Sequence, residues 1–492
     1  MWPFNKHSST FLSNATGNLL SSILAKALIL AALFVSARVL GPAQYGVWAM
    51  CSLIIYWSVF INLGTHAIML QEIAAHPGDT DRHYAEGVRN KTLTLTLLLI
   101  GISIAALYAI LLTSAGARSP GVRLNVHGVA AIIVLLQLFL YLLSYWSGMH
   151  LFRAVSALRS LYAGITCACI LVMVFSWGIQ ALIWGTLCGY LYAIVSVFLR
   201  YPFKVRLEID IAFFKWILKA GFPFLCIGIA RVSLHTMDRA FVYTHMGMRA
   251  MGWYSLAYAV SDLLLIISFA VTQVLYAKMV TEYRAKKNAE QVQQLFFSSI
   301  DLCFSGMTLL FVWVWYFAPI LLPRLLPQYV EGLLPSILLS QAAIFLSLTV
   351  LCGNFLLAIG HPRRYLAVLI LGCLLKVALV ESVLRHGGGL TEVAIVNLAV
   401  YAILFLAAWH LCGMNKGSVQ GRLRTHVLFP FGLCLATAGL YLLDYLPCCI
   451  AVTKICCMIL FSSVLLWRVR AGLKKVNLKA NESYAYETCT DT

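Results

Sequence analysis

The stretch VLGPAQYGVWAM, residues 39–50, separates two apolar runs and carries glycines at positions 41 and 46. A related stretch, HMGMRAMGWYSLAY, occupies residues 245–258 and carries glycines at positions 247 and 252. Each glycine of the second stretch lies 206 residues after its counterpart, and aromatic residues flank the later glycine of both pairs. Chance is one explanation, because glycine and aromatic residues are common where helices leave a membrane. The other is an internal repeat, which predicts the same turn twice in one fold.

The composition places the chain in a membrane. Of its 492 residues, 61% are hydrophobic and only 11% are charged, whereas a soluble domain has roughly a quarter of its residues charged. The net charge of +18 is compatible with a nucleic-acid partner, but cytoplasmic loops of membrane proteins also collect Lys and Arg. The position of the basic residues decides between these two explanations.

Apolar windows of roughly 17–25 residues are long enough to cross a bilayer as a helix. The sequence contains fourteen such windows, so we expect an all-α polytopic membrane protein with about fourteen transmembrane helices. The windows cover residues 19–37, 47–70, 92–114, 126–150, 160–176, 178–199, 220–244, 252–277, 298–322, 332–359, 365–384, 391–412, 427–446 and 448–467.

The basic residues follow this topology. With the N-terminus in the cytoplasm, most Lys and Arg fall in cytoplasmic loops, as the positive-inside rule requires. The outer loops carry six arginines, at positions 38, 118, 123, 249, 324 and 385. Loss of one span would invert every later loop, so this asymmetry supports the spans and predicts that both termini are cytoplasmic. The charge is thus explained by topology, and we expect no nucleic-acid partner.

The position of the two turns predicts the domain organisation. Six spans separate them, and an even number preserves orientation, so the two halves would be parallel repeats. We expect an N-lobe over residues 1–205, a C-lobe over residues 206–412, and a helix pair with a cytoplasmic tail over residues 413–492. Two six-helix lobes around a central cavity form a transporter architecture. Residues 209–224 combine aromatic residues with Lys215 and Lys219 and predict a helix at the membrane surface.

Charged side chains inside a membrane are costly, and each is a candidate functional residue. Span 220–244 carries several polar groups that fall on one helical face within about 80° of arc. These groups are Arg231, His235, Asp238 and His245, with Arg239 at the edge of the face. Such a face must line a cavity or pack on another polar surface.

The matching first span carries Lys26 near its middle. Lys26 and Arg231 on two facing lobes would attract an anion, since Arg binds phosphate with a planar fork of donors and Lys acts as a point charge. The alternative is structural. Arg231 could be neutralised by Asp238, and Arg239 could pair with its neighbour Asp238.

The following span places Tyr254, Tyr258, Ser261 and Asp262 on one helical stripe. Asp262 could bind a coupling cation, pair with a cavity arginine, or only support the fold. If H+ or Na+ drives the cycle, Asp238 and Asp262 are the candidate coupling residues, with Tyr258 beside them. The sequence shows no catalytic constellation, no metal-ligand spacing and no cofactor motif.

Three further pairs of polar residues lie within spans. Asn62 and His66 are four residues apart and predict a hydrogen bond between helices. Lys376 and Glu381 lie about 140° apart on a helix, so they do not form a simple pair and we assign them no role. On the last two spans, residues 444 and 454 carry opposite charges and could bridge that helix pair.

Several motifs together resemble a known family. They are LGPAQYGVWAM after the first span, INLGTHAIML at residues 61–70, FFKWILKAGFPF at 213–224, MGWYSLAYAV at 251–260, NFLLAIGHPRRY at 354–365 and GGGLTEVAI at 387–395. Their order and spacing resemble the Wzx-type polysaccharide flippases of the multidrug/oligosaccharidyl-lipid/polysaccharide (MOP) superfamily. The resemblance covers about residues 10–415, and it is the order of the motifs that is specific.

This resemblance implies two six-span lobes around a cationic cavity. It implies translocation of undecaprenyl-diphosphate-linked oligosaccharides from the cytoplasmic to the periplasmic leaflet of a bacterial inner membrane, beside a polysaccharide polymerase and a chain-length regulator. The diphosphate-binding role would fall on Lys26 and Arg231, with Arg239 and His235 secondary.

The resemblance leaves other functions open. Many members of the family have twelve spans, whereas lipid II flippases have fourteen, which makes lipid II an alternative substrate. A small-molecule cation exporter of the same superfamily would prefer an acidic cavity. A multispan lipid-linked sugar transferase or polymerase would need converging acidic or histidine residues at the lipid–water boundary.

Overall fold

The computed structural model describes residues 7–76, 82–113, 120–286 and 289–412, and these residues form helices joined by short turns, without a β-strand. The chain divides into two compact units, Met1–Gly252 and Trp253–Thr492, which we describe separately. This division falls at the end of the second glycine turn. The lobe boundary at residue 205, predicted from the repeat, stays a prediction.

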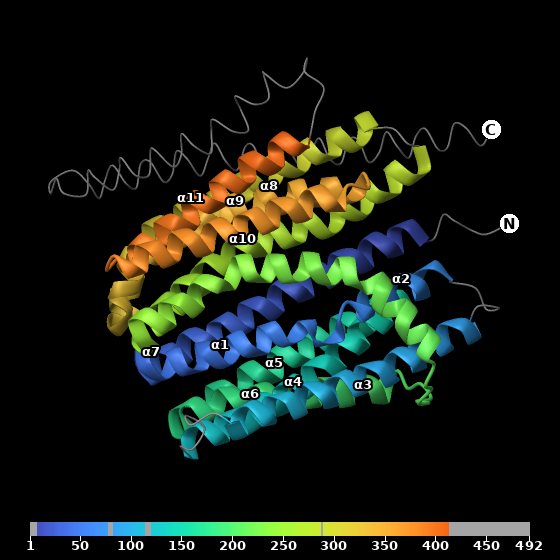
Figure 1. Cartoon of the computed structure of the whole chain (residues 1–492), viewed down its shortest axis with the longest axis horizontal. Helices are drawn as coiled ribbons and strands as arrows, with labels where there is room; N and C mark the ends of the chain where they lie inside the picture. Colours follow the sequence, from blue (N-terminus) through green and yellow to red (C-terminus); the bar gives the residue numbers. More distant parts are fainter. Residues whose placement is uncertain (1–6, 77–81, 114–119, 287–288, 413–492) are drawn as a thin grey trace. The chain divides into compact units, whose positions relative to one another are not determined.

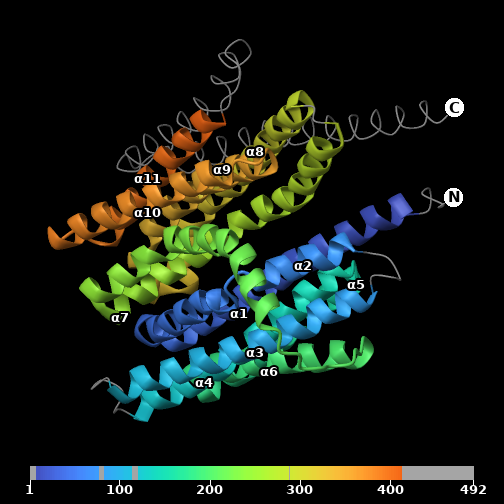
Figure 2. The same cartoon turned by 45° about the vertical axis from the view of Figure 1, so that its right-hand side comes forward.

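The first unit is built from helices that pack side by side (Figures 1 and 2). Helix α5 packs on α1 and α6, and α4 packs on α6 and on the short α2. The elements are α1 (His7–Ser58), η2 (Val59–Asn62), α2 (Thr65–Ala75), α3 (Arg82–Thr113), α4 (Pro120–Gly148), α5 (Phe152–Trp177), α6 (Ile179–Arg200) and the first part of α7 (Ile211–Lys286).

The second unit contains the rest of α7 and the helices drawn in yellow and orange in Figure 1. Helix α9 packs on α8 and α11, and α10 packs on α11. These elements are α8 (Ala289–Leu325), η4 (Pro327–Gly332), α9 (Leu333–Ala358), α10 (Pro362–Arg385) and α11 (Leu390–Leu411).

The described residues contain ten helices long and apolar enough to cross a membrane. Two of them are too long for one crossing. The window Ile211–Leu265 has 55 residues, about 80 Å of helix against a hydrocarbon core of about 30 Å, and Leu24–Asn62 is interrupted by a turn. Counting each as two crossings matches the first twelve predicted spans one to one. The last two, and the charged pair on them, lie outside the described residues.

The two glycine turns have the same backbone conformation. Gly41 has φ 70° and ψ 170°, and Gly247 has φ 82° and ψ −175°. A side chain would be strained at these positive φ values, so glycine is required at both turns. In Figure 1, α1 doubles back at its turn. The matched conformations support the predicted repeat.

The second arm of α1 packs antiparallel against the first arm of α7. Trp57 Nε1 donates a hydrogen bond to Thr236 Oγ1 at 3.1 Å. At the end far from the glycine turn the α1 arm breaks into η2, and the following Gly64 has φ 80° and lies against the backbone of Gly221. Small residues let the two backbones approach closely, as is common between membrane helices.

The start of α7 is amphipathic, as the sequence predicts. Phe214 and Ile217 are buried in a cluster with Ile68 of α2 and Leu95 of α3. On the other side, the exposed residues are Lys215, Trp216 and Lys219. This arrangement suits a helix whose outer face lies among lipid headgroups.

Candidate functional site

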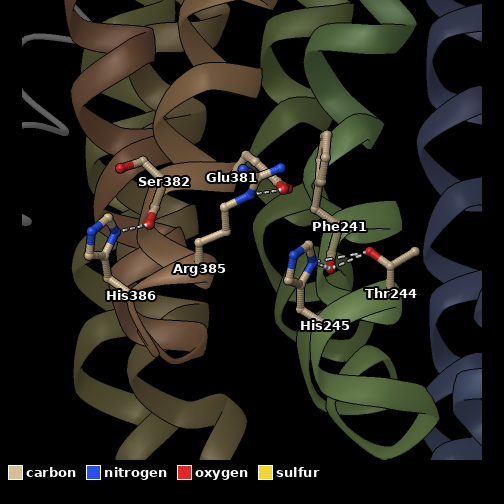
Figure 3. Close-up of polar contacts among 7 residues, drawn as sticks. All are labelled: Phe241, Thr244, His245, Glu381, Ser382, Arg385 and His386. Carbon is tan, nitrogen blue, oxygen red and sulfur yellow. Dashed lines mark hydrogen bonds and ion pairs between the residues drawn. The ribbon is translucent and has the colours of Figure 1, made fainter.

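The polar stripe predicted on span 220–244 lies on the first arm of α7. Along this arm, Arg231 is exposed, His235 and Arg239 are half-buried, and Asp238 is completely buried. His245, at the end of the arm, is exposed, and its Nδ1 lies 3.1 Å from the carbonyl oxygen of Phe241 on the same helix (Figure 3). The stripe therefore combines two exposed residues, Arg231 and His245, with a completely buried carboxylate, Asp238.

Lys26 and Arg231 lie at matching depths. Lys26 precedes the turn glycine Gly41 by 15 residues, and Arg231 precedes Gly247 by 16 residues, which places both about 22–24 Å below their turns by helix rise. Both side chains are exposed. A charged group at this depth must face water or another polar group rather than lipid tails.

The residues predicted on the second arm of α7 lie in the second unit. Tyr258 is buried, and its hydroxyl lies 3.5 Å from Asn397 Oδ1 of α11. Asn397 Nδ2 also donates to the hydroxyl of Tyr254 at 2.9 Å. Asp262, further along the same arm, is half-buried. Tyr258 thus belongs to a packed polar layer, and Asn397 is a member of that layer that the sequence did not single out.

The predicted hydrogen bond between helices involving Asn62 and His66 is present. Asn62 Nδ2 lies 3.3 Å from His66 Nδ1, and His66 Nε2 lies 3.0 Å from Thr96 Oγ1 on α3. His66 is 4% exposed, so this pair joins α2 to α3 rather than lining an open cavity.

A second polar network fixes the linker between α6 and α7, residues 201–210, and the sequence analysis missed it. Arg89 of α3, 4% exposed, donates from Nη2 to the carbonyl oxygen of Lys204 at 2.8 Å. Its guanidinium carbon lies 4.8 Å from the ring centroid of Phe203 and 5.5 Å from that of Tyr145. The guanidinium thus holds both the backbone and a side chain of the linker.

The neighbours of Arg89 hold the acidic end of the linker. Asn90 Nδ2 donates to Glu208 Oε1 at 2.9 Å. Lys91 Nζ lies 2.7 Å from Asp210 Oδ2, and Asp210 Oδ1 accepts the backbone N–H of Phe213 at 3.0 Å. We call these contacts of residues 89–91 with residues 203–210 the linker latch. Its signal in the sequence is a basic pair at residues 89 and 91, near the start of α3, and an acidic pair at residues 208 and 210 of the linker.

The comparison with known families places the chain in one of them. Residues 35–328 match the family described as polysaccharide biosynthesis protein. The chain belongs to this family. The match covers more than half of the sequence, including both glycine turns, Arg231 and the linker latch. No curated protein matches the chain.

Solved structures share the fold of this polysaccharide biosynthesis protein. An inward-facing multidrug resistance MATE family transporter of the MOP superfamily gives a TM-score of 0.65 at 16% identity, over 81% of this chain and 98% of its own. The lipid II flippase MurJ, in an inward closed conformation, gives 0.66 at 14% identity, over 91% and 97%. A MOP superfamily transporter from Pyrococcus furiosus, described by the reverse polarity of its binding pocket, gives 0.59 at 14% identity, over 81% and 95%.

These likenesses establish the fold of this family member, a multi-pass all-helical membrane protein with the MOP architecture. The family match confirms the polysaccharide family that the motifs resemble. Within the described residues, no group of three or more His, Cys, Asp or Glu could hold a metal ion. The roles of Lys26, Arg231, Arg239, His235, Asp238, Asp262 and Tyr258 stay predictions.

Proposed function

We propose that the chain is a flippase for undecaprenyl-diphosphate-linked oligosaccharide repeat units, which it moves from the cytoplasmic to the periplasmic leaflet of a bacterial inner membrane. Membership of a polysaccharide biosynthesis family supports the pathway, and the MOP fold supports a transporter. The observation that carries the proposal is the exposure of Lys26 and Arg231 at matching depths below the two repeated turns.

The proposed cycle is alternating access. The planar fork of Arg231 and the point charge of Lys26 bind the diphosphate in a wet cavity, while the polyprenyl tail stays in the lipid. His235 and Arg239, on the same arm of α7 as Arg231, assist. Both termini are cytoplasmic in this scheme, and a polymerase and a chain-length regulator receive the product.

The test is flipping of fluorescent lipid-linked oligosaccharide in proteoliposomes that contain Lys26→Ala or Arg231→Ala. Each variant is expected to lower the initial rate at least about tenfold, the effect of losing 1.4 kcal/mol of interaction. Arg231→Lys keeps the charge but loses the fork, so we expect an intermediate rate. Arg153→Ala and Lys215→Ala remove exposed cytoplasmic charges and serve as matched controls. Wild-type flipping by both cavity variants would reject the assignment of Lys26 and Arg231.

The same assay separates the alternatives. Lipid II is offered to the wild-type protein as the second candidate substrate. If the protein flips lipid II faster than lipid-linked oligosaccharide, it is a lipid II flippase. Efflux of small cations without lipid flipping would favour an exporter. Chemical conversion of the lipid-linked sugar by the purified protein would show a transferase or polymerase.

If the cycle is driven by a cation, H+ or Na+, Asp238 and Asp262 are the proposed coupling residues. The complete burial of Asp238 favours it, because a membrane-buried carboxylate is expensive unless it serves function or structure. The test is the dependence of flipping on a proton or Na+ gradient in Asp238→Asn and Asp262→Asn. A gradient response that survives both substitutions excludes these residues.

A further inference from the structure

The linker between α6 and α7 carries a row of exposed apolar side chains. Residues 202–210 form neither helix nor strand, and every second residue toward their end is apolar and exposed. We call these residues the linker row: Val205, Leu207, Ile209 and Ile211, whose side chains are 53–75% exposed. The alternation is that of an extended chain, in which successive side chains point to opposite faces. Adjacent apolar side chains that stay exposed mark a surface that another molecule covers.

The acidic residues of the linker point the other way, toward α3. The backbone N–H of Glu208 donates to Thr94 Oγ1 at 2.9 Å, and its carboxylate accepts the hydrogen bond from Asn90. The carboxylate of Asp210 is held by Lys91. The linker latch therefore keeps both carboxylates against α3, on the face opposite to the linker row.

Basic residues lie beside the linker row along the chain. Between residues 200 and 211 the sequence has three basic residues and two acidic ones. The basic residues are Arg200, Lys204 and Arg206, and all three are exposed. The latch holds Lys204 by its carbonyl oxygen and not by its ammonium. An apolar face edged by Lys and Arg suits the boundary between headgroups and acyl chains in an anionic membrane.

The linker row leads into a helix that contacts lipid. Along the first arm of α7, Trp216, Phe222 and Phe224 are also exposed, and the window Ile211–Leu265 is apolar enough to cross a membrane. Tryptophan is enriched where helices leave a membrane. The exposed apolar side chains thus extend from the linker to a membrane helix, and the lipid around that helix is well placed to cover the linker row.

We propose that the linker row and its three basic residues form a docking surface for anionic phospholipids of the surrounding leaflet. The apolar side chains contact the acyl chains, while Arg200, Lys204 and Arg206 bind the phosphate groups of headgroups such as phosphatidylglycerol. The linker latch serves this surface, because it holds two carboxylates away from the anionic headgroups.

The primary experiment places the photo-cross-linking amino acid benzoylphenylalanine at position 209 of the full chain. The protein is held in nanodiscs with equal amounts of phosphatidylglycerol and phosphatidylcholine, and mass spectrometry counts the adducts of each lipid. We expect phosphatidylglycerol adducts to outnumber phosphatidylcholine adducts about fivefold, the effect of a single basic residue near an anionic surface. Added salt should lower this ratio, because mobile ions screen exposed charges. A probe at position 207 repeats the measurement if the first variant fails to fold.

Loss of charge tests the selectivity. The triple variant Arg200→Gln, Lys204→Gln and Arg206→Gln should lower the ratio to about one, because the linker then offers no cation to the headgroups. The linker latch binds none of these three side chains, so it should stay closed. The matched control replaces three other exposed arginines with glutamine, at positions 153, 363 and 364, and should keep the ratio of the unsubstituted protein.

A second probe position controls for general contact with lipid. Val172 is 78% exposed on α5, and this helix has no basic residue after Arg159. A probe at position 172 should therefore form lipid adducts with a ratio of about one.

Three results overturn the proposal. Equal adducts of the two lipids at position 209 show that the linker row does not select anionic lipid. Absence of lipid adducts there, while the probe at position 172 forms them, shows that the linker row lies outside the membrane. Adducts with a protein instead of phospholipid in intact cells assign the linker row to a protein partner. These readouts need no transport, so a chain that fails to flip lipid-linked oligosaccharide rejects the proposed function and leaves this inference standing.

Discussion

Gly46 and Gly252 each lie against the backbone of the other's turn. A Cβ atom on Gly46 would overlap the carbonyl oxygen of Met248, and one on Gly252 would overlap that of Pro42. Pro42 and Met248 occupy the same position in the two turns, as do the two glycines. The contact is therefore reciprocal, with the same pair of positions meeting twice, which is the signature of a two-fold interface.

This reciprocity predicts equal effects of two distant substitutions. Gly46→Ala and Gly252→Ala each force a methyl group into a carbonyl oxygen, and backbone cannot move aside as a side chain can. We expect both to lower the midpoint temperature of unfolding by similar amounts. Gly101→Ala is the control, since nothing lies within 4 Å of a Cβ at this helical position, and alanine there should stabilise by about 0.5–1 kcal/mol. A strong effect at only one of the two turn positions would contradict the symmetry.

The linker latch predicts a large effect of Arg89. Arg89→Ala removes a buried, charged donor from the Lys204 carbonyl and from the ring of Phe203, so we expect a loss of about 1.5–3 kcal/mol in the free energy of unfolding. Arg153→Ala, an exposed arginine at the start of α5, should change it by less than about 0.5 kcal/mol. Denaturant titration in mixed micelles measures both. Equal, small effects would show that the latch contributes nothing to stability.

The acidic end of the latch predicts a pH effect with a definite sign. The hydrogen bond from Lys91, and next the backbone N–H of Phe213, hold the pKa of Asp210 below its ordinary value of 3.8. Because this pKa is lowered, the contribution of Asp210 to stability is present above the ordinary value and is lost as the pH falls through the lowered one. Lys91→Ala should move the NMR titration midpoint of the Asp210 carboxyl carbon upward. An unchanged midpoint would mean that Lys91 does not lower the pKa of Asp210. Lys215→Ala, which removes an exposed lysine, is the matched control.

The buried histidine predicts a difference between two substitutions of Thr96. Thr96→Val keeps the shape of the side chain but leaves His66 Nε2 without its hydroxyl partner, a loss of about 1–3 kcal/mol for a buried polar group. Thr96→Ser keeps the hydroxyl and should cost less. Thermal unfolding of the two variants checks this order, and a Ser variant less stable than the Val variant would show that packing, not hydrogen bonding, dominates at this position.

The parts of this structure that the sequence could predict are those determined by local chemistry. Apolar length predicts where membrane helices run, and a four-residue spacing predicts that Asn62 meets His66. The turns were predictable because Gly41 and Gly247 permit a backbone that other residues resist. In each case the interacting groups lie within a few residues of one another.

The parts that escaped prediction depend on residues distant in the sequence. Arg89 and the carbonyl of Lys204 are 115 residues apart, and Lys376 and Tyr401 lie on different helices. Helical periodicity shows the face on which a residue lies but not the helix that it meets. The break after η2 was also missed, because Leu63 adopts φ 49°, a conformation that its residue type does not suggest.

The linker latch also imposes an order on the synthesis of this protein. The guanidinium of Arg89 emerges from the ribosome 115 residues before the Lys204 carbonyl that it binds, which corresponds to roughly 6–23 s of translation at 5–20 residues per second. The rest of α3 and three further helices, α4 to α6, must be made before that partner exists. During this interval the guanidinium of Arg89 lacks its native backbone acceptor, and the latch can form only after the first six predicted spans have been synthesised.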